Sequence, residues 1–459
     1  MSKTSYLKAL KALFPANAVL TDPSQCWAYA YDNSRRHVLP DAVVFPTTTK
    51  EVQSLVCFCW ENSLPLIPRG SGTGTPGGSV PVPKGIVLST ERMQSIVAFS
   101  PEDRTVTVQP GVINAHLQAH VGQKGFFWPP DPSSANTCTI GGNLAYNSAG
   151  PRAIKYGTPR ENTLGLTAIT GKGELIQTGC HTTKGVVGYD LTRLLIGSEG
   201  TLAVITEAIL KLHPKPEAVA TLQLWFESIE SATDAIAAVM SQPIVPCALE
   251  WMDTHSVKLV RENTDLPVPD QAKALVMLEV DGPKEHLPYL VDQVLTVIKT
   301  GCLQVEQAHN AQDKERLWNA RKALSPLLRQ IAPKKINEDV VVPVSKIPQL
   351  INHLESLASK TNIAIVNFGH AGNGNIHVNL LVDPLDAAQM RHANEVLSEV
   401  FDIVLSLNGT ISGEHGIGLE KKPYVTRELS PQVITLMAEI KKGFDPKGIL
   451  NPNKIFDLP

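Results

Sequence analysis

The chain has 459 residues, which is too many for one ordinary hydrophobic core, so two or three domains are expected. Its apolar content of 43%, charged content of 19% and net charge of −3 are typical of a globular protein and argue against nucleic acid as a partner. No apolar run reaches the roughly 20 residues of a membrane span, and the seven scattered cysteines offer no iron–sulfur motif and fit a reducing compartment.

The first part of the chain predicts a βαβ unit. A strand over 42–45 is followed by a capping box at Thr48 and Glu51, a helix over 52–60 and a strand over 65–68. Strands at 85–89, 95–99 and 105–108 and a helix over 112–121 come next. The segment 126–162 is rich in Gly, Pro, Asn and Ser, and so long a loop is usually functional. A hairpin over 164–178 and a strand over 202–212 precede a linker at 213–217.

Beyond the linker the pattern changes. Strands near 219–226, 246–252, 274–280 and 302–308 alternate with helices near 228–240, 285–299 and 311–331. A hairpin over 363–368 and 375–381, a long helix over 386–407 and one further C-terminal helix complete the chain. This order predicts an α+β domain built on an antiparallel sheet.

The sequence PRGSGTGTPGGS, residues 68–79, contains GxGxxG from Gly72 to Gly77. A Rossmann loop must open a helix, but the prolines at 76, 81 and 83 forbid a helix here. The glycine density between 70 and 78 instead favours a nest of backbone N–H groups around a phosphate, with hydroxyl donors from Ser71, Thr73 and Thr75. A merely flexible turn is the alternative.

Two later segments strengthen the phosphate interpretation. TIGGNLAYNSAG, residues 139–150, places small residues and amides where a planar ligand can approach the backbone, and GSEGTLAVIT, residues 197–206, leads into a strand. The order of the three segments resembles the FAD-binding domain of the vanillyl-alcohol oxidase / p-cresol methylhydroxylase family. Some relatives attach FAD through a histidine near the first loop, but no histidine lies between 38 and 115, so non-covalent FAD is expected.

The resemblance implies a set of FAD contacts in this numbering. The pyrophosphate would lie on Arg69, Gly70, Ser71, Gly72, Thr73 and Gly74. The isoalloxazine and ribityl would lie against Pro130, Asp131, Ser134, Gly141, Gly142, Asn143, Asn147, Ser148 and Gly150. The remainder of the cofactor would meet Glu199, Gly200, Ile205 and Asn451.

A second motif, GHAGNGNIHVN at residues 369–379, places His370 and His377 on either side of a glycine-rich turn. Pairing of the two strands can bring both imidazoles together. SGEHGIG, residues 412–418, adds Glu414 and His415. Two histidines and one glutamate make a metal site with open positions, suited to Zn²⁺ or Mn²⁺. The alternative is that these groups are satisfied core or surface side chains.

This pairing of motifs resembles the C-terminal domain of FAD-linked D-2-hydroxy-acid dehydrogenases, which include D-lactate, glycolate and D-2-hydroxyglutarate dehydrogenases. The resemblance implies that His370, His377 and Glu414 bind the metal, that His415 is the general base and that Asn379 contacts substrate. In this chain Asn373 replaces the acidic residue that is usual in the turn, which puts metal affinity in question.

Substrate capture needs a cation. Arg321, in LWNARKALS, resembles the family's carboxylate clamp, and a guanidinium fits a carboxylate bidentately. Lys335 and Ser325 are candidate further anchors. An exposed helix charge is the alternative for Arg321.

The resemblance predicts three parts: a two-subdomain, PCMH-type FAD-binding domain over 1–215, a substrate- and metal-binding α+β domain with a ferredoxin-like antiparallel sheet over 216–418, and a C-terminal segment over 419–459 that returns to the FAD domain. The predicted reaction is FAD- and metal-dependent oxidation of a D-2-hydroxy acid, with D-lactate or glycolate favoured over D-2-hydroxyglutarate. Hydride goes to flavin N5, and electrons pass to an external quinone, cytochrome or electron-transfer flavoprotein.

Two other functions remain open: a metal-free FAD oxidase of the vanillyl-alcohol oxidase type, and an FAD-bearing subunit of a multi-chain glycolate oxidase. We expect a cytoplasmic protein with no membrane span and no nucleic-acid partner. Homodimerisation and peripheral attachment to the inner membrane through the electron acceptor are left open.

Overall fold

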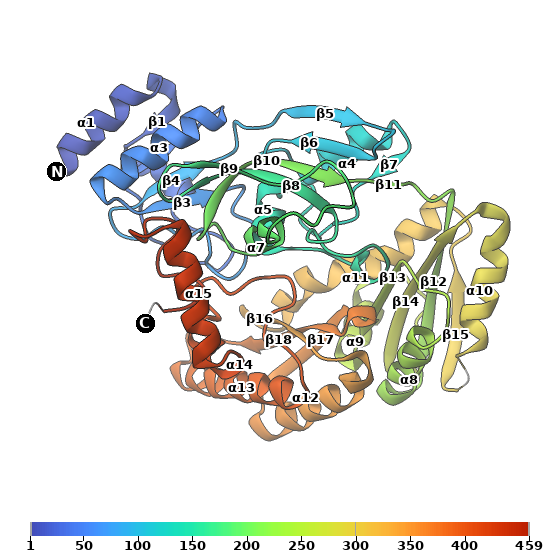
Figure 1. Ribbon diagram of the computed structural model, residues 1–459. Helices are drawn as coiled ribbons and strands as arrows, with labels where there is room; N and C mark the ends of the chain where they lie inside the picture. The colour runs from blue at the N-terminus through green and yellow to red at the C-terminus, as the bar shows by residue number, and fades with distance from the viewer. Residues whose placement is uncertain (1, 299, 458–459) are drawn as a thin grey trace. The chain divides into compact units, whose positions relative to one another are not determined.

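The computed structural model describes residues 2–298 and 300–457 (Figure 1). The chain divides into two compact units. The first comprises the residues up to Gly150, Gly157–Lys215 and those from Glu414 onward, and the second comprises Pro151–Tyr156 and Pro216–Gly413. Each unit combines helices with β-sheet, so the predicted α+β class is confirmed.

The first unit begins with a four-stranded sheet in the order β1 (Val19–Leu20), β2 (Ala42–Val44), β4 (Ile86–Ser89), β3 (Leu66–Arg69). Strands β2 and β3 both run parallel to β4, which lies between them. Helix α3 (Thr49–Asn62) links β2 to β3, and the Thr48 hydroxyl accepts a hydrogen bond from the Glu51 N–H at its start. Its apolar face and that of α1 (Lys3–Leu13) pack into the core over this sheet.

The second sheet of this unit is antiparallel. Its order is β5 (Ile96–Ser100), β6 (Thr105–Val108), β10 (Ala203–Lys211), β8 (Thr163–Thr170), β9 (Leu175–Gly179). Helices α4 (Asn114–Gly122), α5 (Ile140–Tyr146) and α7 (Leu191–Leu195) bury apolar side chains in its core. The short strand β7 (Phe126–Phe127) pairs with β11 (His213–Pro214), so the predicted linker at 213–217 begins as a strand.

Helix α5 corrects the expectation of an irregular loop over 126–162. The Thr139 hydroxyl accepts a hydrogen bond from the Gly142 N–H at 3.2 Å, and Asn147 ends the helix with a left-handed φ of 55°. These two caps stabilise a seven-residue helix despite Gly141 and Gly142 at its start.

The second unit is built on a seven-stranded sheet, and every pairing in it is antiparallel, as predicted. Its order is β15 (Cys302–Gln307), β12 (Ala218–Phe226), β14 (Ala274–Gly282), β13 (Ala248–Met252), β17 (Ala364–His370), β18 (Asn375–Val382), β16 (Lys334–Val341). Strand β16 and helices α9 (Thr254–Asn263) and α12 (Ile347–Thr361) were not predicted. The helix predicted over 285–299 is α10 (Leu287–Thr296), and residue 299 lies outside the described residues.

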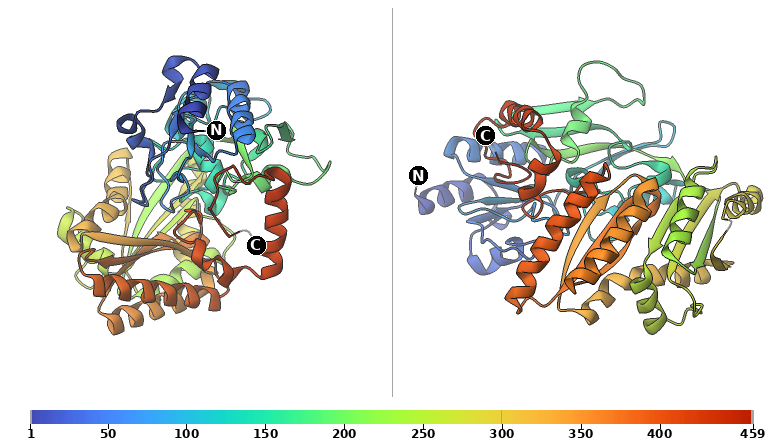
Figure 2. Two further views of the ribbon diagram at one scale, coloured as in Figure 1. Left: turned by 90° about the vertical axis from the view of Figure 1, so that its left-hand side faces the viewer. Right: turned by 90° about the horizontal axis from the view of Figure 1, so that it is seen from below.

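Helices cover both faces of this sheet. Helices α9 and α11 (Ala311–Ile331) pack against Met252, Phe368 and their neighbours on one face. Figure 2 (right) shows α8 (Ile229–Met240), α12 and α13 (Ala387–Ser406) side by side across the other face. Among the helices of the described residues, none is long and apolar enough to cross a membrane.

Candidate functional site

The glycine loop, residues 70–78, leaves the end of β3 in the first unit. Its carbonyls are held from behind: Gly74 O accepts from Asn33 N at 3.0 Å, Pro76 O from Leu419 N at 2.7 Å and Gly78 O from Asn451 Nδ2 at 2.8 Å. Within the residues that the structure describes, the backbone N–H groups of 71–75 donate to no protein acceptor. With Gly72 at φ +70°, this loop has the donor set that a phosphate nest requires, so it fits the pyrophosphate of FAD.

The loop packs on both ends of α5. A Cβ at Gly70 would overlap Thr139 Oγ1, and one at Gly78 would overlap the Tyr146 hydroxyl. A Cβ at Gly74 would lie 3.2 Å from the Tyr146 ring. These close approaches explain the glycines, and they bring together the first two segments that the sequence singled out.

Arg69 was predicted to contact the pyrophosphate. The structure buries its side chain and directs its guanidinium at the backbone, with Nη1 donating to Tyr31 O at 2.6 Å and Nη2 to Ala28 O at 3.4 Å. Burial lowers the pKa of Arg69. The Arg69 side chain therefore stabilises the backbone of residues 28–31, next to the glycine loop.

Glu199, in the third segment, is buried and has a left-handed φ of 51°. Its carboxylate accepts from Ile417 N at 2.7 Å and Gly418 N at 2.9 Å, and its carbonyl accepts from Asn451 Nδ2 at 2.7 Å. Burial raises the pKa of Glu199 to about 7. Glu199 thus holds the third segment and the C-terminal part of the chain together.

The remaining predicted FAD contacts of the first unit lie around α5, in β10 or in the turn before β10. Asn143 Oδ1 accepts from Asn114 Nδ2 at 3.0 Å, and the same Asn114 group donates to Pro130 O at 3.0 Å. Asp131 N donates to Ala149 O at 2.9 Å. The other predicted contacts in this region are Ser134, Gly141, Gly142, Asn147, Ser148 and Gly150, with Gly200 in the turn before β10 and Ile205 within that strand.

Glu414 and His415 also lie in the first unit. Glu414 Oε2 accepts from Gly150 N at 2.8 Å and from Ala149 N at 3.2 Å. Gly416, at φ +86°, leaves no room for a Cβ beside the Tyr146 ring, and Gly418 packs in the same way on Pro76 O. The segment that carries the predicted base therefore lies beside the glycine loop and α5.

In the second unit, His370 ends β17 and His377 lies on the neighbouring strand β18, on the sheet face that α11 covers. Their ring centroids are 5.3 Å apart. Two imidazoles that bind one tetrahedral zinc ion through nitrogens at about 2.0–2.1 Å have centroids roughly 5 Å apart. The pair therefore fits a shared divalent metal.

Glu250, on β13, was missed by the sequence reasoning. Its side chain is 1% exposed, with Oε1 2.5 Å from His370 Nδ1 and Oε2 accepting from Arg321 Nε at 2.9 Å. Burial would raise the pKa of Glu250, but the charges and hydrogen bonds of His370 and Arg321 outweigh burial and lower it. The group is a carboxylate, and it joins the predicted metal ligand to the predicted substrate clamp.

Arg321 is 14% exposed and lies on α11. Its guanidinium carbon is 4.5 Å from the centroid of the Phe368 ring, so the plane is fixed by Phe368 as well as by Glu250. A guanidinium held in this way is suited to bidentate binding of a carboxylate.

Asp339, on β16, is a second buried carboxylate that the sequence reasoning missed. It is paired in register with His377, whose Nδ1 lies 4.0 Å from Asp339 Oδ1. Asp339 also accepts from Asn375 Nδ2 at 2.6 Å and from Gly413 N at 2.9 Å. Gly413 directly precedes Glu414 in the chain.

The three other predicted substrate residues lie on the same unit. Lys335 Nζ donates to Ser325 Oγ at 2.9 Å, which joins two of them. Asn379 is fully buried: its amide nitrogen donates to Val366 O and His377 O, and its oxygen accepts from Asn337 Nδ2 at 2.6 Å. Asn379 therefore supports the strands around His377.

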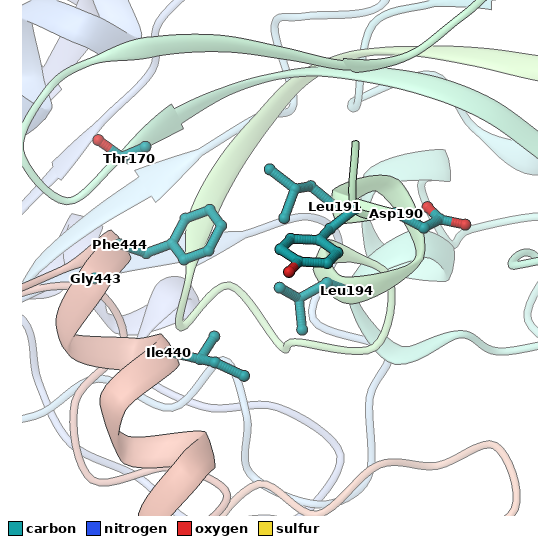
Figure 3. A pocket seen from close by; sticks show the side chains of 8 residues that line it. Thr170, Asp190, Leu191, Leu194, Ile440, Gly443 and Phe444 are labelled. Carbon is teal, nitrogen blue, oxygen red and sulfur yellow. The ribbon is translucent and has the colours of Figure 1, made fainter. Parts of the chain in front are cut away.

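An open, mostly apolar pocket of about 540 Å³ lies in the first unit, between the C-terminal helix α15 (Pro431–Phe444) and the region of α7 (Figure 3). Leu191, Leu194, Ile440 and Phe444 line it. None of its lining residues belongs to the predicted cofactor or substrate site, so it does not mark the chemistry.

Two protein-family models match this chain, one in each half. A family model described as "FAD linked oxidases, C-terminal domain" matches residues 215–455, and one described as "FAD binding domain" matches residues 40–179. The glycolate oxidase subunit GlcD of Bacillus subtilis is 39% identical over 430 residues, covering 93% of this chain and 92% of the relative.

Two further relatives carry other names. A D-lactate dehydrogenase of Anaerostipes hadrus is 33% identical, covering 91% of this chain and 89% of its own length. A D-2-hydroxyglutarate dehydrogenase of Stutzerimonas stutzeri is 32% identical, covering 99% and 100%. The solved structure of p-cresol methylhydroxylase with substrate bound superposes with a TM-score of 0.80 at 17% identity, over 99% of this chain and 97% of that one, which shows a shared fold.

Proposed function

Because this chain belongs to the family of FAD-linked oxidases, we propose that it oxidises a D-2-hydroxy acid to the corresponding 2-oxo acid. It is an FAD-linked oxidoreductase, and the matching relatives are named for glycolate, D-lactate and D-2-hydroxyglutarate. D-Lactate or glycolate is our favoured substrate. The observation that carries the proposal is the guanidinium of Arg321, held by Glu250 beside the histidine pair.

The proposed site has separate groups for the substrate carboxylate, the metal and FAD. Arg321 binds the substrate carboxylate, with Lys335 and Ser325 as further anchors. His370, His377 and Glu414 would hold a divalent metal, Zn²⁺ or Mn²⁺, and the glycine loop with α5 would hold FAD without a covalent bond. When bound, FAD would supply the hydride acceptor, and the metal would supply a Lewis acid for the substrate hydroxyl.

Proton transfer falls to His415. It takes the hydroxyl proton as general base while the Cα–H bond breaks, so the substrate loses one proton and one hydride and becomes the 2-oxo acid. Glu199 supports this step, because its carboxylate fixes the backbone at residues 417–418 just beyond His415. The electrons then leave to an external acceptor.

The test is anaerobic mixing of the FAD-loaded protein with D-lactate, glycolate or D-2-hydroxyglutarate. At least one of them should bleach the oxidised flavin absorbance, and prior treatment with a chelator should abolish bleaching until Zn²⁺ or Mn²⁺ is restored. Failure of all three acids in metal-replete protein would contradict the proposal. Bleaching that survives chelation would favour a metal-free FAD oxidase of the vanillyl-alcohol oxidase type.

A second candidate is an FAD-bearing subunit whose turnover needs partner chains. It is favoured by the Bacillus subtilis relative, which is named as a subunit of glycolate oxidase. The isolated chain assayed with an artificial dye acceptor separates the two: steady turnover supports an autonomous dehydrogenase, and bleaching without turnover supports a dependent subunit.

A further inference from the structure

Glu250 lies on β13, outside the sequence motifs that predicted the site. Strand β13 pairs with β17 in the register Trp251 opposite Gly369 and Met252 opposite Phe368, which places Glu250 opposite His370. Cross-strand neighbours project from the same face of a sheet. The carboxylate therefore faces His370 directly and, with 1% exposure, meets no bulk water.

The two oxygens of Glu250 have different partners. Oε1 binds His370 Nδ1 and Oε2 binds Arg321 Nε. A hydrogen bond from Nδ1–H to a carboxylate fixes the tautomer in which Nε2 carries the lone pair, and it also fixes the ring orientation. The bond to Nε holds the guanidinium at its inner edge, so that the Nη edge is the one positioned for a carboxylate.

We propose that Glu250 is a positioning residue that couples the metal subsite to the substrate subsite, by fixing the tautomer of His370 with one oxygen and the guanidinium of Arg321 with the other. This inference rests on the function proposed above. One buried carboxylate thereby sets the position of a proposed metal ligand relative to the guanidinium that would bind the substrate carboxylate. Disturbing it should therefore weaken both subsites at once.

Two substitutions separate the two bonds. Glu250→Ala removes both acceptors, so Zn²⁺ affinity of the apoprotein should fall about 10- to 100-fold. The KM for the hydroxy acid that reduces the flavin in the wild-type protein should rise at least tenfold. Glu250→Gln keeps one acceptor oxygen, which can serve His370 or Arg321 but not both, so one of the two quantities should change by at least tenfold and the other by less than threefold.

Asp253→Asn is the matched control. Asp253 is buried just beyond the end of the same strand, but its carboxylate serves Ser256 N at 2.8 Å and Asn367 N at 2.6 Å. This variant should lose thermal stability while its Zn²⁺ affinity and KM stay within threefold of wild type. Zinc affinity is measured by competition with a chromophoric chelator, which needs no turnover.

The outcomes are distinguishable. Glu250→Ala with both quantities within threefold of wild type overturns the inference and leaves the proposed function intact. If Glu250→Ala does not fold, Glu250→Gln decides, because unchanged metal affinity together with an unchanged KM overturns the coupling. A wild-type protein that binds no Zn²⁺ or Mn²⁺ and is not bleached by any of the acids removes the function and the inference with it.

Discussion

Among single residues, Glu199 has the clearest dependence on pH. It is buried, and its ionised form is stabilised by two backbone N–H groups at 2.7 and 2.9 Å. These bonds do not fully offset the loss of hydration, so the pKa of Glu199 rises from 4.5 to about 7. Charging this side chain therefore costs more in the folded state than in the unfolded state.

We predict that Glu199 destabilises the protein progressively as pH rises. Between pH 4.5 and 7 the folded state retains the proton that the unfolded chain has released, so stability falls over this range and the loss is complete above pH 7. The shift corresponds to about 3 kcal/mol. The Tm of wild type minus the Tm of Glu199→Gln should therefore fall by at least about 2 °C between pH 5 and 8.

Glu439→Gln provides the comparison for that series, because Glu439 is exposed on α15. Its Tm difference from wild type should stay constant over the same pH range. A constant difference for Glu199→Gln as well would show that Glu199 titrates in the folded state as it does in the unfolded chain.

Among the elements, the glycine loop is the one whose backbone conformation should determine cofactor binding. Gly72 has φ +70°, and a Cβ there would overlap the Arg69 guanidinium. We predict that Gly72→Ala weakens FAD binding by about tenfold, since left-handed backbone alone costs an L-residue roughly 1–2 kcal/mol. Flavin fluorescence titration of the apoprotein measures the change in Kd.

Gly443→Ala is the control for that substitution. Gly443 lies in α15, its φ is not positive, and a Cβ there meets nothing within 4 Å. This variant should bind FAD normally and unfold at a slightly higher temperature, because Ala is favoured over Gly in a helix by up to about 1 kcal/mol. Equal FAD affinities in the two variants would remove the loop's conformation as a determinant of binding.

The sequence predicted local features of the site better than distant ones. The prolines after Gly74 exclude a helix by a rule that needs no tertiary information, and His370 and His377 are close because one hairpin joins them. Helix α5 was not predicted because the two glycines at its start disfavour a helix, although Thr139 and Asn147 cap its ends. Glu250 was missed because it lies 120 positions before His370, and their contact depends on β13 pairing with β17, which spacing along the chain does not encode.

At the scale of the whole molecule, the C-terminal segment closes the first unit. Asn451 Nδ2 donates to Gly78 O and to Glu199 O, so one buried amide joins the glycine loop to the third segment. Asn451→Asp keeps the shape and the left-handed backbone but directs an acceptor at both carbonyls. We predict a loss of about 1–3 kcal/mol and a lower FAD content after purification, measured by Tm and by absorbance.

Asn453→Asp tests whether an Asn-to-Asp change at a left-handed position lowers stability by itself. Asn453 has φ +65° and an exposed side chain, so the change should stay within about 0.5 kcal/mol of wild type. If the two variants lose stability equally, the bridging role of Asn451 is wrong.

The interrupted path of the first unit has a consequence for synthesis. The chain leaves that unit at Lys215 and returns at Glu414, and Glu199, Asn451 and the glycine loop meet only after the return. At about 5–20 residues per second, a ribosome needs roughly 10–40 s to make the intervening part. Throughout that interval Glu199 and the glycine loop lack the contacts that Ile417, Gly418 and Asn451 supply, so the predicted FAD-binding segments are complete only near the end of synthesis.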